Sequence, residues 1–405
     1  MVPNGWETLS ASDSCNSVSV GVVIKPSQYY VDSNIGIKAF RSANVREGFI
    51  NDTDWVYFSP EGHKANKKSQ LREGDVLIVR SGYPGTACVV TKEFEGSNAI
   101  DIVIARTNDE IIIPEYLCTF INSSLGKDQI LNLQGGLAQK HFNVGAFKHL
   151  YVNIPPLPEQ RKIAQILSTW DRGIATTEKL IDASKQQKKA LMQQLLTGKK
   201  RLVDPETGKA FEGDWEEVKV AEFGKVVTGN TPPKNDDSNY GSDISWATAE
   251  DFKSKYVGNT KVKLTKVGAS KARIVPKGSV LVTCIASIGK NAITDENITT
   301  NQQINAVVIN NNHCNEFFYY QIEFNKHKLL AWAGTTAVPI LNKSSFEKIP
   351  LSAPSKNEQQ KIASVLTATD KEIELLQAKL AHFKQEKKAL MQQLLTGKRR
   401  VSLSS

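Results

Sequence analysis

Two stretches of the chain repeat mostly apolar residues at alternating spacings of four and three positions, from Ile163 to Leu195 and from Ile362 to Leu394. This alternation places the repeated side chains along one stripe of an α-helix, as in the seam of a coiled coil. The pattern therefore predicts two long helices with matching seams. The predicted seam positions are Ile163, Leu167, Trp170, Ile174, Thr177, Ile181, Ser184, Lys188, Leu191 and Leu195 in the first, and Ile362, Leu366, Thr369, Ile373, Leu376, Leu380, Phe383, Lys387, Leu390 and Leu394 in the second.

The boundaries of the first helix are marked by proline and glycine. Pro155 to Pro158 end an extended stretch, and the helical pattern then continues to Thr197, directly before Gly198. Proline at the start and glycine beyond the end are typical helix boundaries. A helix of about 39 residues spans about 58 Å at 1.5 Å per residue. One such stripe alone is compatible with an ordinary helix facing a core, but two matched stripes favour an antiparallel coiled coil between two globular parts.

Further apolar residues on these helices lie outside the seam. If the seam is buried, this second row is left over, and surplus apolar surface usually marks a site for another protein. We therefore expect a partner-binding row made of Ile166, Met192, Leu196, Val365, Met391 and Leu395.

The chain also contains an internal duplication. The twelve residues Lys188–Lys199 recur without change as Lys387–Lys398, and the same offset of 199 positions aligns Asp171 with Asp370 and Glu159-Gln160 with Glu358-Gln359. Further upstream the correspondence is reduced to scattered positions. Each half therefore joins a diverged segment to a preserved one, which is the organisation expected for a repeat that reads a target in two parts.

The diverged segments alternate short β-branched or apolar runs with Gly, Asn and Asp turns, as in Val76–Val79, Ala99–Ile104 and Ile304–Ile309. These runs predict strands of a mixed α+β domain. Landmarks recur in order in the two segments, including Trp6 and Trp215, so we expect one shared fold. The predicted organisation is a first globular domain at 1–150, a helical region at 151–202, a second globular domain at 203–350 and a helical region at 351–405, with a polar linker at 204–209.

The composition indicates a folded protein with a basic surface. The chain has 405 residues, of which 40% are hydrophobic and 23% charged, and 51 Lys and Arg against 42 Asp and Glu give a net charge of +9. This balance favours a polyanionic partner without proving one. The five cysteines are widely spaced and predict buried thiols in a reducing compartment. Without a long apolar run or a signal peptide at the start, we expect a cytoplasmic protein and no membrane contact.

The sequence offers little support for catalysis. We find no phosphate-binding Gly-rich loop and no tight set of metal ligands, and we interpret His313-Cys314 as a turn. Ile154 to Leu157 lacks the polar and aromatic residues of the motif used by amino-methyltransferases, and Asp204 with Glu217-Val218-Lys219 matches a nuclease core only loosely. We therefore expect no catalytic residue and no metal site, and we favour a binding subunit.

Several motifs together resemble the specificity subunit of type I restriction-modification systems. The second helix start departs from the pattern, because Ala353–Gln359 lacks prolines that the first one has. The matching motifs are Pro155–Gln160, Leu195–Lys199, Val79–Gly82 with Gly85, Thr228–Pro232, Ile244–Trp246 and Asn301–Gln303.

The resemblance implies that each globular domain recognises one half of a bipartite double-stranded DNA target and that the coiled coil sets the unread spacer. It also implies that two methyltransferase subunits, which carry S-adenosylmethionine and modify adenine, dock on the helices. Restriction subunits that use ATP and Mg²⁺ would join them for cleavage. On this interpretation the present chain holds no cofactor of its own.

Candidate DNA contacts are basic residues in Gly-, Asn- and Ser-containing stretches, where loops would carry them. Each of these residues is equally compatible with a solvated surface position. The candidates are Arg41, Arg46, Arg80, Lys140 and His141 in the first domain, and Lys234, Lys271, Arg273, Lys290 and Lys343 in the second.

Two other functions stay open at this point. The chain would be a self-sufficient site-specific nuclease or methyltransferase if the missing motifs were present in an unfamiliar form. It would be a scaffold without DNA binding if only the coiled coil were functional. Activity of the purified chain with magnesium or S-adenosylmethionine would identify the first, and absence of salt-dependent DNA binding with the methyltransferase partner would identify the second.

Overall fold

The computed structural model describes residues 2–133, 142, 144–334 and 338–403. The chain divides into two compact units, one formed by Met1–Glu178 with Ala378–Ser405 and the other by Lys179–Gln377. We call these the first and the second unit. Each unit holds one globular domain and one segment from each long helix.

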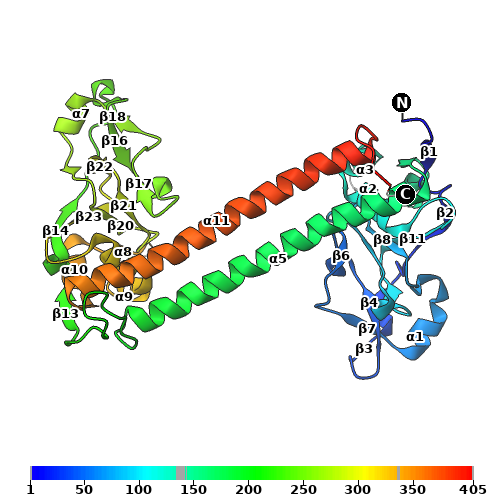
Figure 1. Ribbon diagram of the computed structural model, residues 1–405, viewed down its shortest axis with the longest axis horizontal. Helices are drawn as coiled ribbons and strands as arrows, with labels where there is room; N and C mark the ends of the chain where they lie inside the picture. Colours follow the sequence, from blue (N-terminus) through cyan, green and yellow to red (C-terminus); the bar gives the residue numbers. More distant parts are fainter. Residues whose placement is uncertain (1, 134–141, 143, 335–337, 404–405) are drawn as a thin grey trace. The chain divides into compact units, whose positions relative to one another are not determined.

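The two long helices are α5 (Leu157–Leu195) and α11 (Lys356–Leu395) (Figure 1). Both are followed by a glycine with φ of +70°, Gly198 and Gly397, a left-handed conformation that ends helices readily because glycine has no Cβ. The helix boundaries that Pro and Gly predict are thus close to those of the structure.

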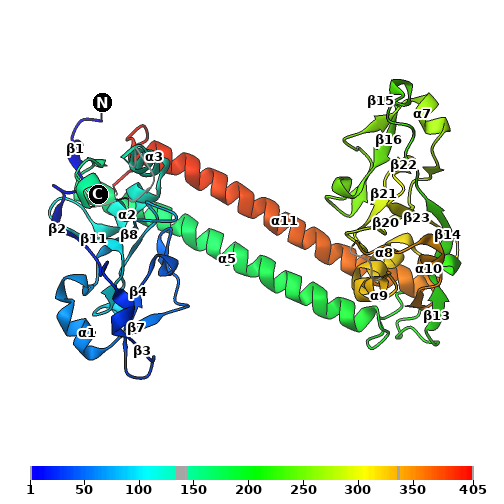
Figure 2. The same cartoon turned by 180° about the vertical axis from the view of Figure 1, so that it is seen from behind.

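The seam predicted from the heptads is confirmed. Every seam position in both helices is buried or half-buried, and the positions between them are mostly exposed. In the first unit the N-terminal part of α5 lies beside the C-terminal part of α11, with the rings of Trp170 and Phe383 5.6 Å apart and nearly perpendicular. In the second unit the C-terminal part of α5 lies beside the N-terminal part of α11, and the two parts again run in opposite directions (Figures 1 and 2). The two helices therefore form an antiparallel coiled coil.

The first domain contains two four-stranded sheets with helices against them. One sheet has the order β2-β11-β8-β9 and the other β10-β4-β7-β3. The strands of the first sheet are β2 (Cys15–Val20), β11 (Ile102–Thr107), β8 (Val76–Val79) and β9 (Ala87–Val89), and those of the second are β10 (Asn98–Ala99), β4 (Ile37–Phe40), β7 (Val56–Phe58) and β3 (Tyr30–Val31). The remaining elements are β1 (Glu7–Ser10), β12 (Tyr151–Ile154), β5 (Val45–Arg46), β6 (Phe49–Ile50), α1 (Pro60–Ala65), α2 (Pro114–Asn122), α3 (Ser124–Leu133) and α4 (Val144–Phe147).

The second domain repeats this plan with two five-stranded sheets, in the orders β14-β23-β20-β21-β17 and β15-β18-β16-β22-β19. The strands are β14 (Gly224–Thr228), β23 (Ile304–Ile309), β20 (Val280–Thr283), β21 (Asn291–Thr294), β17 (Tyr256–Val257), β15 (Tyr240–Gly241), β18 (Lys263–Leu264), β16 (Ile244–Ala247), β22 (Ile298–Thr300) and β19 (Ile274–Val275). The remaining elements are β13 (Glu216–Lys219), β24 (Pro350–Ala353), α6 (Val220–Phe223), α7 (Lys266–Ser270), α8 (Asn315–Phe324), α9 (Lys326–Ala331) and α10 (Lys343–Glu347).

The strand predictions are confirmed with one difference. Val76–Val79 and Ile304–Ile309 are strands as expected, but the run Ala99–Ile104 is divided between β10 and β11. The break falls at Asp101, whose φ of 51° is unusual for a residue with a Cβ and turns the chain from one sheet into the other. Each domain is a mixed α and β structure. In both domains, a strand that precedes the two main sheets pairs with the strand that precedes the long helix, β1 with β12 and β13 with β24.

The expectation of an exposed second apolar row is wrong. Met192, Leu196 and Leu395 are 7%, 2% and 0% exposed, and the other three residues, Ile166, Val365 and Met391, are half-buried against the same apolar clusters. The physical reason is that these positions lie near the helix ends, where the domain of the same unit covers them. The partner-binding role of the six residues stays a prediction.

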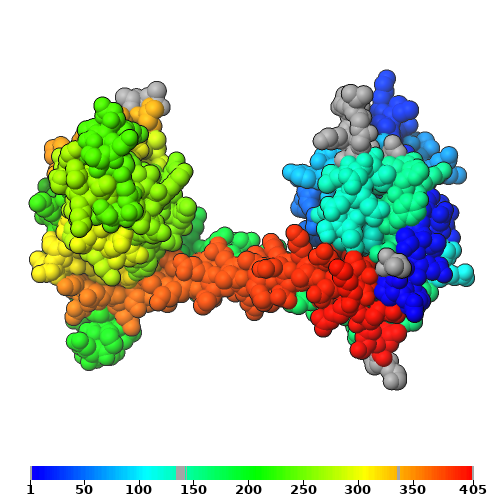
Figure 3. All heavy atoms as spheres, turned by 90° about the horizontal axis from the view of Figure 1, so that it is seen from above, coloured from blue at the N-terminus to red at the C-terminus, as the bar shows by residue number. Residues whose placement is uncertain are grey.

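Most other positions of the helices face solvent, including Leu375, which is 71% exposed. Figure 3 shows this outer surface of α11 in orange and red. Within the described part of the chain, no helix combines the length and apolar character needed to cross a bilayer.

Candidate nucleic-acid interface and helix junctions

A buried carboxylate lies at the start of each long helix and pairs with an arginine that follows the other one. In the second unit, Arg201 Nε and Nη2 donate to Glu358 Oε1 and Oε2, each at 2.7 Å. In the first unit, Arg400 Nε donates to Glu159 Oε2 at 2.8 Å, and this pairing raises the pKa of Arg400. Both carboxylates are buried, so each needs its arginine to remain charged without a large desolvation penalty. The two pairs occupy positions related by the duplication.

The neighbouring glutamines bind the main chain of the domain in their own unit. Gln160 Nε2 donates to the carbonyls of Ile111 and Pro155, both at 2.8 Å, and its Oε1 accepts from the Ile113 N–H at 3.0 Å. Both glutamine side chains are buried.

Gln359 repeats two of these three bonds in the second unit, and its Nε2 lies 3.1 Å from His313 Nδ1 in place of the third. Its Nε2 donates to the Pro354 carbonyl at 2.8 Å, and its Oε1 accepts from the Cys314 N–H at 3.0 Å. The repeated Glu-Gln sequence therefore joins each helix to its domain, a role that the sequence alone did not reveal.

Charged pairs also cross the coiled coil in each unit. Lys188 Nζ lies 2.9 Å from Asp370 Oδ1 in the second unit, and Lys387 pairs with Asp171 in the first. The four residues are two equivalent pairs, because both lysines and both aspartates are 199 positions apart. Lysine at a seam position packs its stem along the apolar stripe and holds its charge at the edge.

Among the described residues, the second domain surrounds its lysine–aspartate pair with further polar groups and the first domain does not. Tyr320 Oη donates to Asp370 Oδ2 at 2.5 Å, and Lys188 Nζ also contacts Glu323 at 3.1 Å. Burial disfavours charge on Lys188, but Glu323 and Asp370 outweigh it and raise the pKa of the lysine. Burial and the bond to Asp370 raise the pKa of the Tyr320 hydroxyl, which therefore remains a donor.

Lys255 extends the network from the loop before β17. Its Nζ donates to Thr367 Oγ1 at 2.6 Å and to Tyr320 Oη at 3.2 Å, and it lies 3.3 Å from Glu316 Oε1. Lys255 is 8% exposed, and burial lowers its pKa despite the opposing effect of Glu316.

Three candidate DNA contacts of the first domain are described: Arg41 and Arg80 directly follow strands β4 and β8, and Arg46 is the last residue of β5. Arg41 donates to the Asp54 carbonyl, and Arg46 Nη1 to the Val45 carbonyl at 3.1 Å. Arg80 forms an ion pair with Asp101, and its Nε donates to the Phe142 carbonyl at 3.2 Å. Lys140 and His141 fall outside the described residues. Bonds to main-chain carbonyls leave the positive charges of Arg41 and Arg46 available to a phosphate, whereas the Asp101 carboxylate offsets the charge of Arg80.

In the second domain, the structure brings two candidates together at Thr228–Asn230. Arg273 Nη1 donates to the Thr228 carbonyl at 2.6 Å, and Asn230 Nδ2 donates to the Lys271 carbonyl at 2.7 Å. Both basic side chains are exposed. The motif Thr228–Pro232, found in the sequence, thus organises this basic surface.

The other candidates of the second domain are separate. Lys290 Nζ donates to the Ala249 carbonyl at 2.6 Å, Lys343 pairs with Glu347 at 3.5 Å along α10, and Lys234 is exposed on the loop after Thr231. In the described part of the chain, no contact joins these three lysine side chains into one patch.

A hollow of about 540 Å³ lies beside Arg46 in the first domain. Its wall includes Ser81, Gly82 and Tyr83 from the β8–β9 loop. Tyr83 is 84% exposed. The sequence marked the glycines of this loop but did not single out the tyrosine between them.

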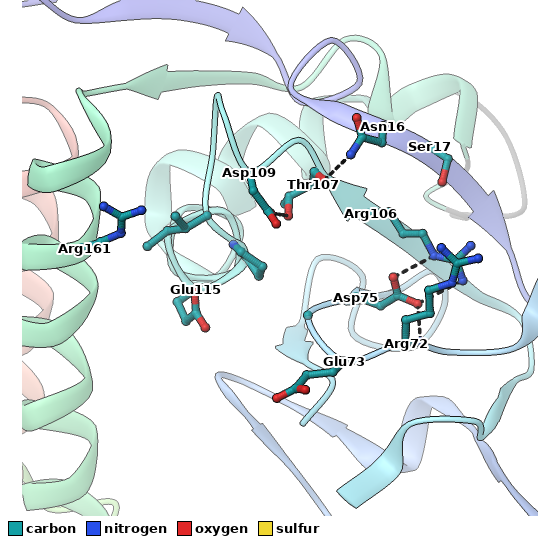
Figure 4. A pocket seen from close by; sticks show the side chains of 13 residues that line it. Asn16, Ser17, Arg72, Glu73, Asp75, Arg106, Thr107, Asp109, Glu115 and Arg161 are labelled. Carbon is teal, nitrogen blue, oxygen red and sulfur yellow. Dashed lines mark hydrogen bonds and ion pairs between the residues drawn. The ribbon is translucent and has the colours of Figure 1, made fainter. Parts of the chain in front are cut away.

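A second hollow of the first domain, of about 590 Å³, holds charges of both signs (Figure 4). Arg106 Nε donates to Asp75 Oδ1 at 2.9 Å within it, and Arg161 enters from α5. The matching position of the second domain has a hollow of about 630 Å³ lined by Glu316 and Gln360, the counterparts of Glu115 and Arg161. Paired charges of both signs therefore line the hollow of the first domain, and the second domain has a hollow at two equivalent positions.

The cysteine thiols have low reactivity in this fold. All five are free thiols, and burial raises the pKa of Cys15 and Cys88 to about 12 and that of Cys284 to about 11. A protonated thiol is a weak nucleophile and a weak metal ligand. Among the described residues, no group of three or more His, Cys, Asp or Glu side chains is arranged to hold a metal ion.

Comparison with known proteins identifies related chains of similar length. The putative type I restriction enzyme MjaX specificity subunit of Methanocaldococcus jannaschii is 25% identical over 416 residues, covering 99% of this chain and 95% of the relative. The type I restriction enzyme HindI specificity subunit of Haemophilus influenzae is 30% identical over 165 residues, which cover 38% of this chain and 36% of that protein.

Solved structures share the fold. The S subunit of a type I restriction-modification system from M. genitalium matches with a TM-score of 0.61 and 12% identity, over 100% of this chain and 99% of its own. The HsdS subunit from Thermoanaerobacter tengcongensis matches with a TM-score of 0.52 and 17% identity, over 98% of both chains.

The family model of the type I restriction modification DNA specificity domain matches this chain twice, over residues 4–185 and 212–385. Each match contains one globular domain and most of the long helix that follows it. With two domains of one fold, two preserved helix junctions and these two matches, the chain belongs to the type I restriction-modification DNA specificity family.

Proposed function

We propose that this chain is the DNA sequence-recognition subunit of a type I restriction-modification complex and performs no catalytic step itself. The observation that carries the proposal is the presence of two matches to the DNA specificity family, each on a domain joined to a preserved helix. Diverged domains on preserved supports suit a protein that must change what it reads while keeping how it assembles. Base contacts specify a target, so the residues that make them must be free to vary.

Each domain reads one half of a bipartite double-stranded DNA target in this proposal. Residues 1–150 and 203–350 are the two reading domains, and residues 151–202 and 351–405 are the helical regions that set the unread spacer. Arg41, Arg46, Arg80, Lys140 and His141 would contact DNA from the first domain. Lys234, Lys271, Arg273, Lys290 and Lys343 would do so from the second.

The partners in this proposal are two methyltransferase subunits and the restriction subunits of the same system, assembled in the cytoplasm. S-adenosylmethionine, ATP and Mg²⁺ would be held by those subunits. The pseudo-equivalence of the two helix junctions supports two equivalent docking positions, because a surface that occurs twice in one chain can bind the same partner twice.

Methylation mapping tests the proposal. The chain is expressed with the methyltransferase subunit of its system in cells without other adenine methylation, and methylated adenines are located by sequencing. We expect one motif made of two specific parts and a spacer of fixed length. Methylation or cleavage by the purified chain alone, with S-adenosylmethionine or Mg²⁺, would instead establish the alternative of a self-sufficient enzyme.

The spacing role has its own test. Inserting one heptad into each helix preserves the seam and adds about 10 Å per helix at 1.5 Å per residue. B-DNA rises about 3.4 Å per base pair along each strand, so the spacer should lengthen by roughly three base pairs. Loss of methylation would mean that the domains cannot follow the groove, and an active protein with the original spacer would exclude the coiled coil as the ruler.

A further inference from the structure

The loop between β8 and β9 has a fixed backbone with an exposed tip. The Gly85 N–H donates to the Val79 carbonyl at 3.1 Å, the Thr86 N–H donates to the Tyr83 carbonyl at 3.2 Å, and the Val79 N–H donates to the Thr86 carbonyl at 2.9 Å. These bonds close the loop at its base. Gly82 and Tyr83 are left exposed beyond them.

The loop between β20 and β21 in the second domain has the same bonds at the corresponding positions. The Gly289 N–H donates to the Thr283 carbonyl at 2.9 Å, the Lys290 N–H to the Ser287 carbonyl at 3.3 Å, and the Thr283 N–H to the Lys290 carbonyl at 2.9 Å. Its exposed tip is Ala286-Ser287. The two loops are therefore one backbone design carried by two unrelated side-chain sets.

The φ angles agree at two corresponding pairs of positions. Gly82 and Gly85 have φ of +83° and +82°, and their counterparts Ala286 and Gly289 have +62° and +81°. Left-handed φ is unfavourable for alanine, which has a Cβ, so its presence at this position means that the surroundings hold the backbone in this shape. The conformation of the loop is thus maintained even where the residue that suits it best is absent.

The base of each loop is also tied to the segment that leads to the domain's last short helix. The Phe142 N–H donates to the Arg80 carbonyl at 3.0 Å, and the Leu341 N–H donates to the Cys284 carbonyl at 2.8 Å. Phe142 and Leu341 are buried at 0% and 1% exposure. Each tip is therefore held from a rigid base.

The tip side chains differ in size and chemistry. Tyr83 carries a large aromatic ring with a hydroxyl and is 84% exposed, whereas its counterpart Ser287 carries only a short hydroxyl. Tyr83 borders the hollow that Arg46 also lines, and Phe49, paired with Arg46 across the β5–β6 hairpin, is 61% exposed. Two solvent-facing aromatic rings beside an arginine are an unusual surface for a protein without a ligand there.

We infer that the tips of these two loops contact base edges of the DNA target, with Tyr83 and Ser287 as specificity-determining residues of the first and second half-sites. The inference rests on the proposed function and adds to it the reading element and its position.

The chemistry of the tips fits bases better than phosphates. Phosphate contacts come mainly from Arg and Lys and carry no sequence information, while hydroxyl groups and apolar carbons at a tip can meet donors, acceptors and the thymine methyl group in a groove. A fixed loop with an exchangeable tip delivers different side chains to the same place. That is the property a reading element needs.

The test exchanges the two tip residues in the full chain, expressed with its methyltransferase subunit. Tyr83→Ser should change or relax the preference at a position of the first half-site by roughly tenfold, the effect typical of one mismatched base pair. The second half-site and the spacer should not change. Ser287→Tyr should do the reverse, affecting only the second half-site.

Tyr151→Ser is the matched control, because Tyr151 is also exposed, at 53%, but lies on β12 outside the loop. It should leave both half-sites unchanged. Since Tyr83 and Ser287 are uncharged, their substitution should also leave the salt dependence of DNA binding by the complex unchanged, whereas loss of a phosphate contact would reduce it.

The outcomes separate the inference from the function beneath it. If the unaltered chain produces a two-part methylation motif and both tip variants produce the same motif with the same preferences, the tips do not read DNA. Loss of methyltransferase binding in either variant would assign the tip to a protein contact and also overturn the inference. An unaltered chain that yields no two-part motif would overturn the proposed function, and the inference with it.

Discussion

The helix junctions of both units bind a proline carbonyl and a main-chain N–H through their glutamine, but their charged pairs differ in surroundings and exposure. In the second unit, the Lys188 and Asp370 side chains are 16% and 19% exposed and are joined by Tyr320, Glu323 and Lys255. In the first, the Lys387 and Asp171 side chains are 21% and 46% exposed.

The difference originates in the short helix that packs at each junction. Tyr320 is the sixth residue of α8, and the sixth residue of α2 is Thr119. The ninth residues are Glu323 and Asn122. Both units thus contain the same lysine–aspartate pair, which is more buried in the second unit than in the first. The pair therefore does not depend on the surroundings that a particular domain provides.

Removing an arginine should produce the largest difference in stability between the two units. Arg201→Met leaves the fully buried Glu358 carboxylate without its partner, and we expect the second unit to lose about 3–5 kcal/mol of stability. Arg400→Met should destabilise the first unit less, because the Arg400 side chain is already 44% exposed and water can take its place. Amide hydrogen exchange of peptides from β24 and β12 measures the two units separately. Equal losses would contradict the difference in burial.

Replacing the aspartates should give the next largest difference in stability between the two units. Asp370→Asn weakens bonds to Tyr320 and Lys188, so we expect a loss of about 1.5–3 kcal/mol in the second unit, as for hydrogen bonds to charged groups. Asp171→Asn should cost the first unit about 0.2–1 kcal/mol, as for an exposed ion pair. Urea unfolding followed by unit-resolved hydrogen exchange checks both values. A larger effect of Asp171→Asn would show that the Lys387 pair, rather than the Tyr320 network, dominates.

The glutamines should behave alike in the two units. Gln160→Ala leaves one main-chain N–H and two carbonyls without these bonds, and Gln359→Ala leaves one N–H and one carbonyl. Each substitution should cost its own unit about 1–3 kcal/mol. The exposed Gln165→Ala is the control and should have no measurable effect on unfolding. Unequal losses of stability in the two variants would show that the two glutamines do not stabilise their units equally.

The smallest expected contrast is in pH dependence. Burial lowers the pKa of His313 below its ordinary 6.5, although the Gln359 bond and Glu222 oppose the shift. The native state therefore binds fewer protons than the unfolded chain in this range, and the second unit should lose stability as the pH falls from neutral through 6.5 to the lowered pKa.

His313→Gln should remove this dependence. In the first unit the matching residue is Ile112, which does not titrate, so that unit should show no corresponding change. Thermal unfolding between pH 7.5 and pH 5.5, a range of about one unit on either side of the ordinary histidine pKa, provides the measurement. A decrease that persists in the variant would assign it to other groups.

The coiled coil was predictable because its signal is local and periodic. Each seam residue is three or four positions from the next, and the duplication supplied a second copy in the same register. Periodicity shows which side chains share a stripe but not what covers them. Met192 and Leu395 were therefore expected at the surface although the domains of their own units cover them.

The candidate contacts show the other limit. The partners of Arg80 and Arg273 are distant in the sequence, Asp101 and the Thr228 carbonyl, so only the fold brings them together. Tyr83 was missed because an aromatic residue between glycines is compatible with either a packed or a free position. The backbone that exposes it is held by hydrogen bonds that form in the folded loop and leave no periodic signal in the sequence.

The contacts of Gln160 and Gln359 have a consequence for how readily domains can be exchanged between proteins of this kind. Both side chains address peptide groups of the domain, the N–H of Ile113 or Cys314 and carbonyls such as those of Ile111 and Pro354. Every amino acid presents a carbonyl there, and every amino acid except proline presents the N–H. These glutamine bonds therefore place few demands on the side chains of an incoming domain, although Gln359 Nε2 also lies 3.1 Å from His313 Nδ1 and apolar residues at the helix ends still need a matching surface.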